Sequence, residues 1–245
     1  MGLEDPARLS RSHAIKLRPP QIVELPGFWI DKTEVTNAMY ARCVAAGDCD
    51  EPLTPVLPPY QNYYQNPAYG EYPVLGVTFD NAKTYCQWSK RHLPTEAEWE
   101  KAARGTDGRI WPWGNKFDWS KGNFRGNHDP YEQVAPVGRF PRGASPYGAH
   151  DMAGNVYEWC EDLYDPEYYS KSPADNPPPN RTGDLGVMRG GDWVKGRIAS
   201  RGYERYWRIP EGTSPGIGFR CVIDADRALE LLEAAEAGRA GTQGK

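Results

Sequence analysis

The chain has 245 residues, which allows one large domain or two small ones, and its 39% hydrophobic and 25% charged residues are typical of a globular protein. Its net charge of −4 argues against a nucleic-acid partner, because phosphate binding usually requires a basic face. No apolar run approaches the roughly 18 residues of a membrane span. The first twenty residues lack the apolar core of a signal peptide, so we expect either a cytoplasmic protein or an extracytoplasmic one whose leader has been removed.

Aromatic residues are frequent in a chain that is also rich in glycine and proline. There are 9 tryptophans and 15 tyrosines beside 26 glycines and 23 prolines. This combination predicts an irregular, loop-rich α+β fold that packs rings, with little regular secondary structure.

The N-terminal part begins with a predicted tail over residues 1–20. Residues 23–32 read as one or two short strands around a Pro-Gly turn. A helix is predicted from Thr36, a favourable N-cap, to a stop at Gly47.

The next part contains a proline- and tyrosine-rich loop and two helices. Residues 51–72 are predicted to form a loop ordered by its rings, and residues 79–89 a helix. A third helix begins at Thr95, because Thr95 and Glu98 have the spacing of a capping box, and Trp99 starts its buried stripe.

Helical periodicity is absent after Gly105 until the end of the chain. Short strands are predicted at 133–138, 187–191 and 218–223. Residues 224–237 form an amphipathic helical pattern with Leu229 and Leu232 on one face. The predicted organisation is therefore a tail over 1–20, one domain over 21–224, and a C-terminal helix and tail over 225–245.

The five cysteines are Cys43, Cys49, Cys86, Cys160 and Cys221. None are spaced as CxxC, which disfavours a thiolate zinc site. Cys43 and Cys49 bracket a Gly-Asp turn and could close a small loop. The odd count leaves at least one thiol free, and five buried reduced cysteines are an open alternative.

Several segments, in a fixed order along the chain, resemble the formylglycine-generating-enzyme (sulfatase-modifying factor) family. They are FWIDKTEVTNAMYARC (28–43), YPVLGVTFDNAKTYCQWSKRHLPTEAEWEKAARG (72–105), WPWGN (111–115), GNFRGN with APVGRFP (122–141), YGAHDMAGNVYEWCED (147–162), MRGGDW (188–193) and GIGFRC (216–221). The resemblance implies a modified C-type-lectin-like fold, irregular and loop-rich. It also implies a disulfide between Cys86 and Cys221, whose positions match a bridge found in some family members.

The reaction implied by the resemblance is oxidation of a sulfatase cysteine to formylglycine with oxygen and copper. In active members two cysteines after the RGG strand hold the metal, and soft Cu(I) prefers such thiolates. Residues 189–208 contain no cysteine here, and the segment is also shorter than in active members. We therefore expect no copper and no formylglycine chemistry.

Two calcium sites are also implied by the resemblance. The first would use side-chain oxygens of Asn123 and Asp129 with the carbonyls of Phe124 and Tyr131. The second would use Asp151 and Glu158 with the carbonyls of Gly154 and Val156. Such mixed oxygen sets suit hard Ca²⁺, although Asp and Asn are also common turn residues.

The segment after RGG is rich in arginine, tyrosine and tryptophan, the composition of recognition surfaces. We expect Trp193 and Arg201 to be structural. The expected ligand-binding residues are Asp192, Tyr203, Arg205, Tyr206 and Trp207, the last four in a loop.

Three hypotheses for the function follow. The first is a noncatalytic binding or scaffold domain that recognises a protein or a glycan. The second is a retroelement-diversified ligand-binding protein, because such proteins share this fold; against it, their variable regions usually end the chain, whereas this one continues beyond Cys221. The third is an oxidoreductase of the formylglycine-generating type with unfamiliar chemistry.

Overall fold

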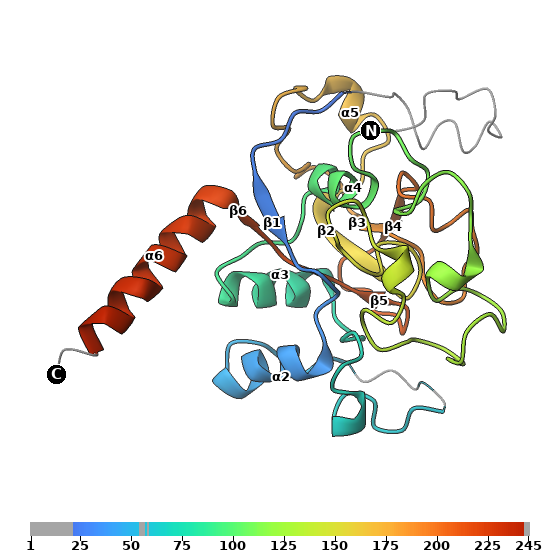
Figure 1. The fold of residues 1–245 in the computed structure, drawn as a ribbon, viewed down its shortest axis with the longest axis horizontal. Helices are drawn as coiled ribbons and strands as arrows, with labels where there is room; N and C mark the ends of the chain where they lie inside the picture. Colours follow the sequence, from blue (N-terminus) through green and yellow to red (C-terminus); the bar gives the residue numbers. More distant parts are fainter. Residues whose placement is uncertain (1–21, 54–56, 58, 243–245) are drawn as a thin grey trace.

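The computed structural model describes residues 22–53, 57 and 59–242, so the predicted tail over residues 1–20 lies outside the described residues. The elements are β1 (Phe28–Ile30), α2 (Asn37–Ala46), η2 (Pro67–Tyr69), α3 (Phe79–Trp88), α4 (Glu96–Arg104), η3 (Trp119–Lys121), η4 (Pro141–Gly143), β2 (Tyr157–Leu163), α5 (Tyr168–Lys171), β3 (Gly186–Arg189), β4 (Tyr206–Arg208), β5 (Ile217–Gly218), β6 (Val222–Asp224) and α6 (Ala225–Thr242) (Figure 1).

Four strands form the main sheet in the order β4-β3-β2-β5, and β1 pairs with β6 in a separate ribbon. β2 is antiparallel to β3 and parallel to β5. α4 packs against β2 and β3, and α3 contacts both β2 and α2. Long loops fill most of the remaining body (Figure 1). This is the irregular α+β architecture predicted from the composition.

The helices begin where the sequence predicts them. Thr36, Thr78 and Thr95 each cap a helix through the side-chain oxygen, and Thr95 forms the predicted capping box with Glu98. α2 ends at Gly47, whose φ of 80° is favourable for glycine. These local signals fix the start of α4, the helix that supplies most of the buried charge described below.

The strand predictions were partly wrong. Residues 133–138 form no strand, because their backbone groups bond elsewhere: the amide of Ala135 donates to the Asn155 side chain and that of Val137 to the carbonyl of Glu71. The longest strand, β2, was missed. Six of its seven residues are buried, so it lacks the alternation that marks a half-exposed strand.

Disulfides and rings order the helical half. Both predicted disulfides, Cys43–Cys49 and Cys86–Cys221, are confirmed. The second closes a 135-residue separation, for which the chain-entropy model gives stabilisation of about 4–5 kcal/mol. In the predicted loop over 51–72, four tyrosine rings contact one another, as expected: Tyr60, Tyr63, Tyr69 and Tyr72.

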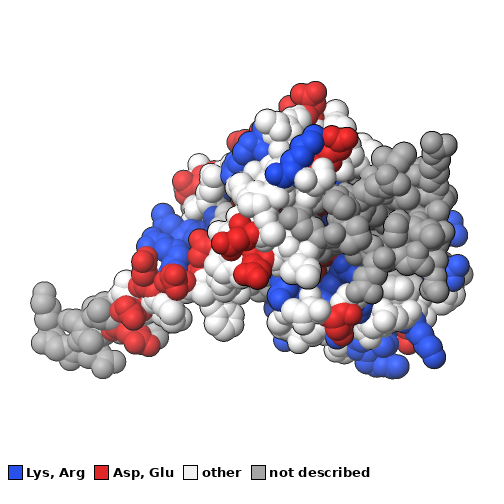
Figure 2. Space-filling view, turned by 90° about the horizontal axis from the view of Figure 1, so that it is seen from above, with Lys and Arg blue, Asp and Glu red and all other residues white. Residues whose placement is uncertain are grey.

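The predicted C-terminal helix exists as α6, which projects away from the body (Figure 1). Leu229 and Leu232 are both exposed on it. Lysine, arginine and acidic side chains are mixed over the face in Figure 2, where no single-sign field dominates. Among the described residues, no helix combines the length and apolar character of a membrane span.

Candidate functional site

The chain turns sharply at the end of β3. Gly190 and Gly191 have φ values of 93° and 77°, and an added Cβ at Gly191 would lie 3.1 Å from the backbone of Ala199. Glycine suits both positions, because it adopts positive φ values readily and has no Cβ to meet the neighbouring backbone. After the turn, the segment 192–205 passes Trp119 at Gly196 and Arg104 of α4 at Gly202 before the chain reaches β4.

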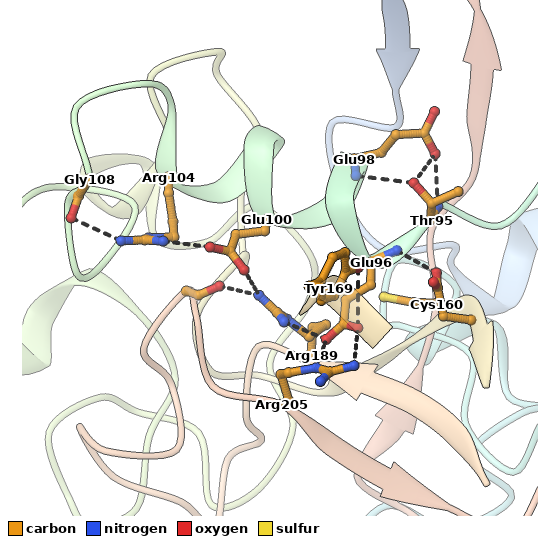
Figure 3. Close-up of polar contacts among 12 residues, drawn as sticks. Thr95, Glu96, Glu98, Glu100, Arg104, Gly108, Cys160, Tyr169, Arg189 and Arg205 are labelled. Atoms are coloured by element: carbon orange, nitrogen blue, oxygen red, sulfur yellow. Dashed lines mark hydrogen bonds and ion pairs between the residues drawn. The ribbon is translucent and has the colours of Figure 1, made fainter. Parts of the chain in front are cut away.

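A buried ion-pair network lies between this segment and α4 (Figure 3). Arg189 donates to Glu96 at 2.6 Å and to Glu100 at 2.7 Å. Arg205 also donates to Glu96, at 2.7 and 2.8 Å, and Arg104 donates to Glu100. Burial raises the pKa of each glutamate, but the arginines outweigh it, lowering the pKa of Glu96 and bringing that of Glu100 to about 2. Both glutamates are therefore ionised, and three guanidinium groups face two carboxylates, so the network does not lack positive charge.

The structure divides the predicted ligand-binding residues into two groups. Tyr203 is buried, with the guanidinium groups of Arg104 and Arg201 over its ring, and Arg205 belongs to the network. Both residues lie in the loop before β4, as predicted, but their side chains are buried. The predicted loop placement was wrong for the other two residues, Tyr206 and Trp207. Tyr206 and Trp207 are half-buried and lie on β4.

Asp192 is a buried carboxylate at the start of the same segment. It is 7% exposed, and its Oδ1 accepts from the amide of Val194 at 3.3 Å. No lysine or arginine lies within ion-pair distance of it in the described part of the chain. Burial raises its pKa to about 6. A buried carboxylate that can change protonation near neutral pH is a feature of functional sites.

An open pocket of about 610 Å³ lies beside the same segment, and the sequence analysis did not identify it. Its lining combines two basic and three aromatic side chains with polar ones: Lys116, Phe117, Asp118, Trp119, Ser120, Lys121 and His128. The Trp119 ring stacks on the His128 ring at 4.4 Å. The pocket borders the turn at Gly196, where an added Cβ would lie 3.7 Å from the Trp119 ring.

The first expected calcium group combines a buried amide with an unsatisfied carboxylate. Asn123 is buried, and its Nδ2 donates to the carbonyl of Gln133 at 2.6 Å. Asp129 Oδ1 accepts from the amide of Tyr131 at 2.8 Å, whereas its Oδ2 is buried without a hydrogen-bond partner in the described structure. Burial raises the pKa of Asp129. A cation at Oδ2 fits this arrangement.

The second expected calcium group contains an acidic residue that sequence analysis missed. Glu158 is fully buried, with both oxygens bonded to Arg220 at 2.6 and 2.7 Å. Asp151 accepts from the amide of Gly138 at 2.6 Å. Glu34 lies beside them, with Oε1 bonded to Asn155 and Oε2 buried without a hydrogen-bond partner among the described residues.

Charge is unbalanced in this second group. Burial raises the pKa of Glu34 well above its usual value, and the neighbouring Asp151 raises it further, against the effect of Arg220. Burial also raises the pKa of Asp151. Three buried carboxylates thus face one guanidinium, and a divalent cation would offset the excess negative charge. The unbonded Oε2 of Glu34 is the oxygen most open to such an ion, because both oxygens of Glu158 already accept hydrogen bonds from Arg220 or Trp99. The calcium site stays a prediction.

None of the five cysteines has an exposed thiol. Four form the two disulfides, and the fifth, Cys160, is buried. Burial raises the pKa of the Cys160 thiol well above its ordinary value, so it stays protonated. A pair of thiolates for Cu(I) is therefore not available at the surface after β3.

Comparison with known proteins gives one matching family model, the sulfatase-modifying factor enzyme 1-like domain, over residues 1–225. The serine/threonine-protein kinase Pkn1 of Chlamydia trachomatis serovar L2 is 36% identical over 220 residues, which cover 84% of this chain and 34% of the kinase. The inactive C-alpha-formylglycine-generating enzyme 2 of Bos taurus is 35% identical over 171 residues, which cover 64% of this chain and 52% of that protein.

Among solved structures, PvdO from Pseudomonas aeruginosa has a TM-score of 0.74 and 27% identity to this chain. The match covers 91% of this chain and 89% of PvdO. The chain thus matches PvdO over nearly its full length, but it spans about a third of the length of the Chlamydia kinase and about half that of the bovine protein.

Proposed function

Because this chain belongs to the family of sulfatase-modifying factor enzyme 1-like domains and has their α+β fold, we propose that it is a noncatalytic binding domain that recognises a protein or a glycan. The surface that would do so lies after β3 and includes β4 and the pocket at Trp119. The main support for this proposal is that none of the five cysteines offers an exposed thiol for copper after β3.

Formylglycine formation in this family requires two thiolates that hold copper next to the substrate cysteine. Here residues 189–208 contain no cysteine, and Cys160 is buried and protonated. Opening a disulfide would not supply the pair either, because the bridges join α2 to the residues just after it and α3 to the chain before β6. A relative that is 35% identical is named as an inactive enzyme, which agrees with this proposal.

The aromatic and basic groups beside the loop support a recognition role. Trp119 and His128 form a stacked ring pair in the pocket, and Lys116 and Lys121 bring positive charge to it. Rings of this kind stack on sugars or on peptide side chains, and ammonium groups bind carboxylates. On β4, the Trp207 ring stacks on Tyr164 at 4.0 Å and presents a second aromatic surface.

Calcium has a structural role in this proposal. Asn123 and Asp129 would hold one ion, and Asp151 and Glu158, joined by Glu34, would hold the other, with the neighbouring carbonyls as further ligands. Hard oxygen ligands suit calcium, and the ion would supply the positive charge that these buried carboxylates lack. Bound calcium would cross-link loops that have little regular secondary structure.

One observation favours the alternative of an enzyme with unfamiliar chemistry. Asp192 has its pKa raised by burial to about 6. Burial, with a smaller contribution from Asp192, raises the pKa values of Tyr157 and Tyr206, whose ring centroids lie 4.9 Å apart. Such a carboxylate could accept or donate a proton near neutral pH. The same residues could equally orient a ligand in a binding site.

Copper titration combined with oxygen uptake separates the two functions. The full chain, supplied with Cu(I), a reductant and a cysteine-containing sulfatase peptide, should consume no oxygen above the buffer rate and leave the peptide mass unchanged. Turnover of the peptide would contradict the proposal. Oxygen uptake that disappears in Asp192→Asn would instead support the enzymatic alternative.

Binding is tested by a fluorescence screen with defined glycans and peptides. A ligand of the pocket should change the tryptophan emission of the native chain, and Trp119→Ala should weaken its binding at least tenfold. Trp29→Ala is the matched control, because Trp29 is a 67% exposed tryptophan on β1 and does not line the pocket. Equal weakening by both variants would contradict the assignment of the pocket.

A further inference from the structure

A histidine and two carboxylates meet at the base of α6, outside the sites described above. His92 precedes α4, Glu98 lies in the first turn of α4, and Asp224 ends β6. One potential metal-binding atom from each residue lies within 4.8 Å of the others. His92 and Glu98 flank the start of one helix, and Asp224 comes from the end of β6, so the tertiary fold completes this cluster.

His92 is oriented to offer a lone pair. Its Nδ1 lies 2.8 Å from the carbonyl oxygen of Leu93. Because a carbonyl can only accept, Nδ1 must carry the proton, and in the neutral ring Nε2 is unprotonated. Nε2 lies 3.8 Å from Asp224 Oδ1, beyond hydrogen-bond distance. A backbone carbonyl on the other ring nitrogen is the usual support of a metal-bound histidine.

Glu98 contributes a buried carboxylate with one oxygen already fixed. Its Oε2 accepts from the amide of Thr95 at 2.8 Å and from the Thr95 hydroxyl at 2.9 Å, whereas Oε1 has no corresponding bond in the capping box. The residue is 7% exposed, and within the described segments no lysine or arginine forms an ion pair with it. The negative charge of Glu98 is therefore held in place without a basic partner.

The backbone around the cluster is well fixed. His92 and Val222 exchange two backbone hydrogen bonds, at 2.9 and 2.8 Å, and Asp224 pairs with Phe28 in the β1-β6 ribbon. The disulfide at Cys221 ties the same segment to α3. Ligands about 2.0–2.1 Å from a tetrahedral ion lie roughly 3.4 Å apart, so a shift of about 1 Å would close the site. The side chain of Asp224, which is 64% exposed, can supply that movement.

A fourth acidic residue near the cluster has other partners. Glu161 Oε2 lies 3.9 Å from His92 Nδ1, the protonated nitrogen, rather than from Nε2. Its Oε1 pairs with Arg181 at 2.7 Å and lies 3.9 Å from Lys83. Glu161 therefore does not belong to the ligand set.

We propose that His92, Glu98 and Asp224 form a zinc-type divalent metal site with water in the remaining position. One imidazole nitrogen with two carboxylates suits Zn²⁺, and hard Ca²⁺ rarely takes a nitrogen ligand. The bound ion would join α4 to the start of α6, whose main contacts are with β1 and β6 (Figure 1). It would thereby fix the direction in which α6 leaves the body.

The test uses Co²⁺ as a spectroscopic probe of the zinc site in the full chain, with calcium in excess to occupy oxygen-only sites. The wild-type protein should bind one equivalent with the visible absorption of a four-coordinate ion, and Zn²⁺ should displace it. Asp224→Asn and His92→Gln should each weaken binding at least tenfold. Circular dichroism of the exposed Asp224→Asn variant confirms that it is folded.

Two controls make the result specific. Asp226→Asn changes an exposed carboxylate in the first turn of α6, and His128→Gln changes a histidine in the Trp119 pocket. Both should bind Co²⁺ as the wild type does. The site is refuted if the wild-type chain binds no Co²⁺, or if Asp224→Asn and His92→Gln retain wild-type affinity. Because no pocket ligand is involved, failure here leaves the proposed binding function unaffected.

Discussion

Two clusters of buried carboxylates among the described residues differ in how many arginines pair with them. Beneath the segment after β3, Glu96 and Glu100 are paired with Arg189, Arg205 and Arg104, and the pKa values of both glutamates are lowered. In the second region, three carboxylates share Arg220, and the pKa values of Glu34 and Asp151 are raised. Burial alone would raise the pKa in both regions, so the number of arginines decides the direction.

This difference suggests a structural role for the cluster around Glu96 and Glu100, and a candidate cation site at the cluster around Glu34. A network in which every carboxylate has arginine partners needs no added cation, and it holds β3, α4 and the loop before β4 together. A group with surplus negative charge is incomplete without a proton or a cation. Asp192 is likewise buried without an arginine partner in the described structure, and burial raises its pKa to about 6. Its role in ligand binding stays a prediction.

The largest effect is expected from breaking the network around Glu96 and Glu100. Arg189→Met removes the guanidinium that bonds both Glu96 and Glu100, and it should lower the free energy of unfolding by roughly 3–5 kcal/mol in urea denaturation. Arg181→Met is the control, because that 55% exposed arginine pairs with Glu161 near the surface and should contribute about 0–1 kcal/mol. A similar decrease in the free energy of unfolding for both variants would show that the buried network stabilises the fold no more than a surface ion pair does.

Replacement of Asp192 by asparagine is expected to stabilise the folded chain. The pKa of this carboxyl is about 6 in the folded chain and near 3.8 when unperturbed, so the folded state loses stability as pH rises through pH 4 to 6. Asp192→Asn should remove this penalty and raise the free energy of unfolding by about 3 kcal/mol at pH 7.5, with no gain at pH 4. A gain that does not change with pH would contradict the assignment.

A smaller effect is expected on β4. Trp207 stacks on Tyr164 but is half-exposed, so Trp207→Ala should cost on the order of 1 kcal/mol in thermal unfolding. Arg205→Met, two residues earlier in the chain, removes a partner of Glu96 and should cost several times more. Equal costs would mean that Trp207 also belongs to the scaffold.

Local signals predicted much of the helical half from sequence. Threonine caps and the spacing of Thr95 and Glu98 act over three or four residues, so the helix starts could be found without any tertiary contact. The same holds for the small Cys43–Cys49 loop. The pairing of Cys86 with Cys221 came only from the family resemblance, since nothing local links positions 135 residues apart.

The candidate site was harder to predict, because its properties depend on long-range pairing. Arg205 has the sequence context of a recognition loop, yet the tertiary fold places it beside Glu96, which lies 109 residues away. Glu34 was missed because its significance arises only when Asp151 and Glu158 are brought next to it. β2 was missed because nearly all its residues, acidic ones included, are buried, so no alternation of buried and exposed positions marks it.

The most direct test compares the same isosteric change in the two regions. In a calcium chelator, Glu34→Gln removes surplus negative charge and should leave the chain at least as stable as the wild type, whereas Glu96→Gln removes the partner of two arginines and should destabilise it by several kcal/mol. Saturating calcium should then raise the unfolding temperature of the wild type more than that of Glu34→Gln. If Glu34→Gln destabilises the calcium-free chain as much as Glu96→Gln does, and calcium stabilises both equally, the distinction between scaffold and cation site is wrong.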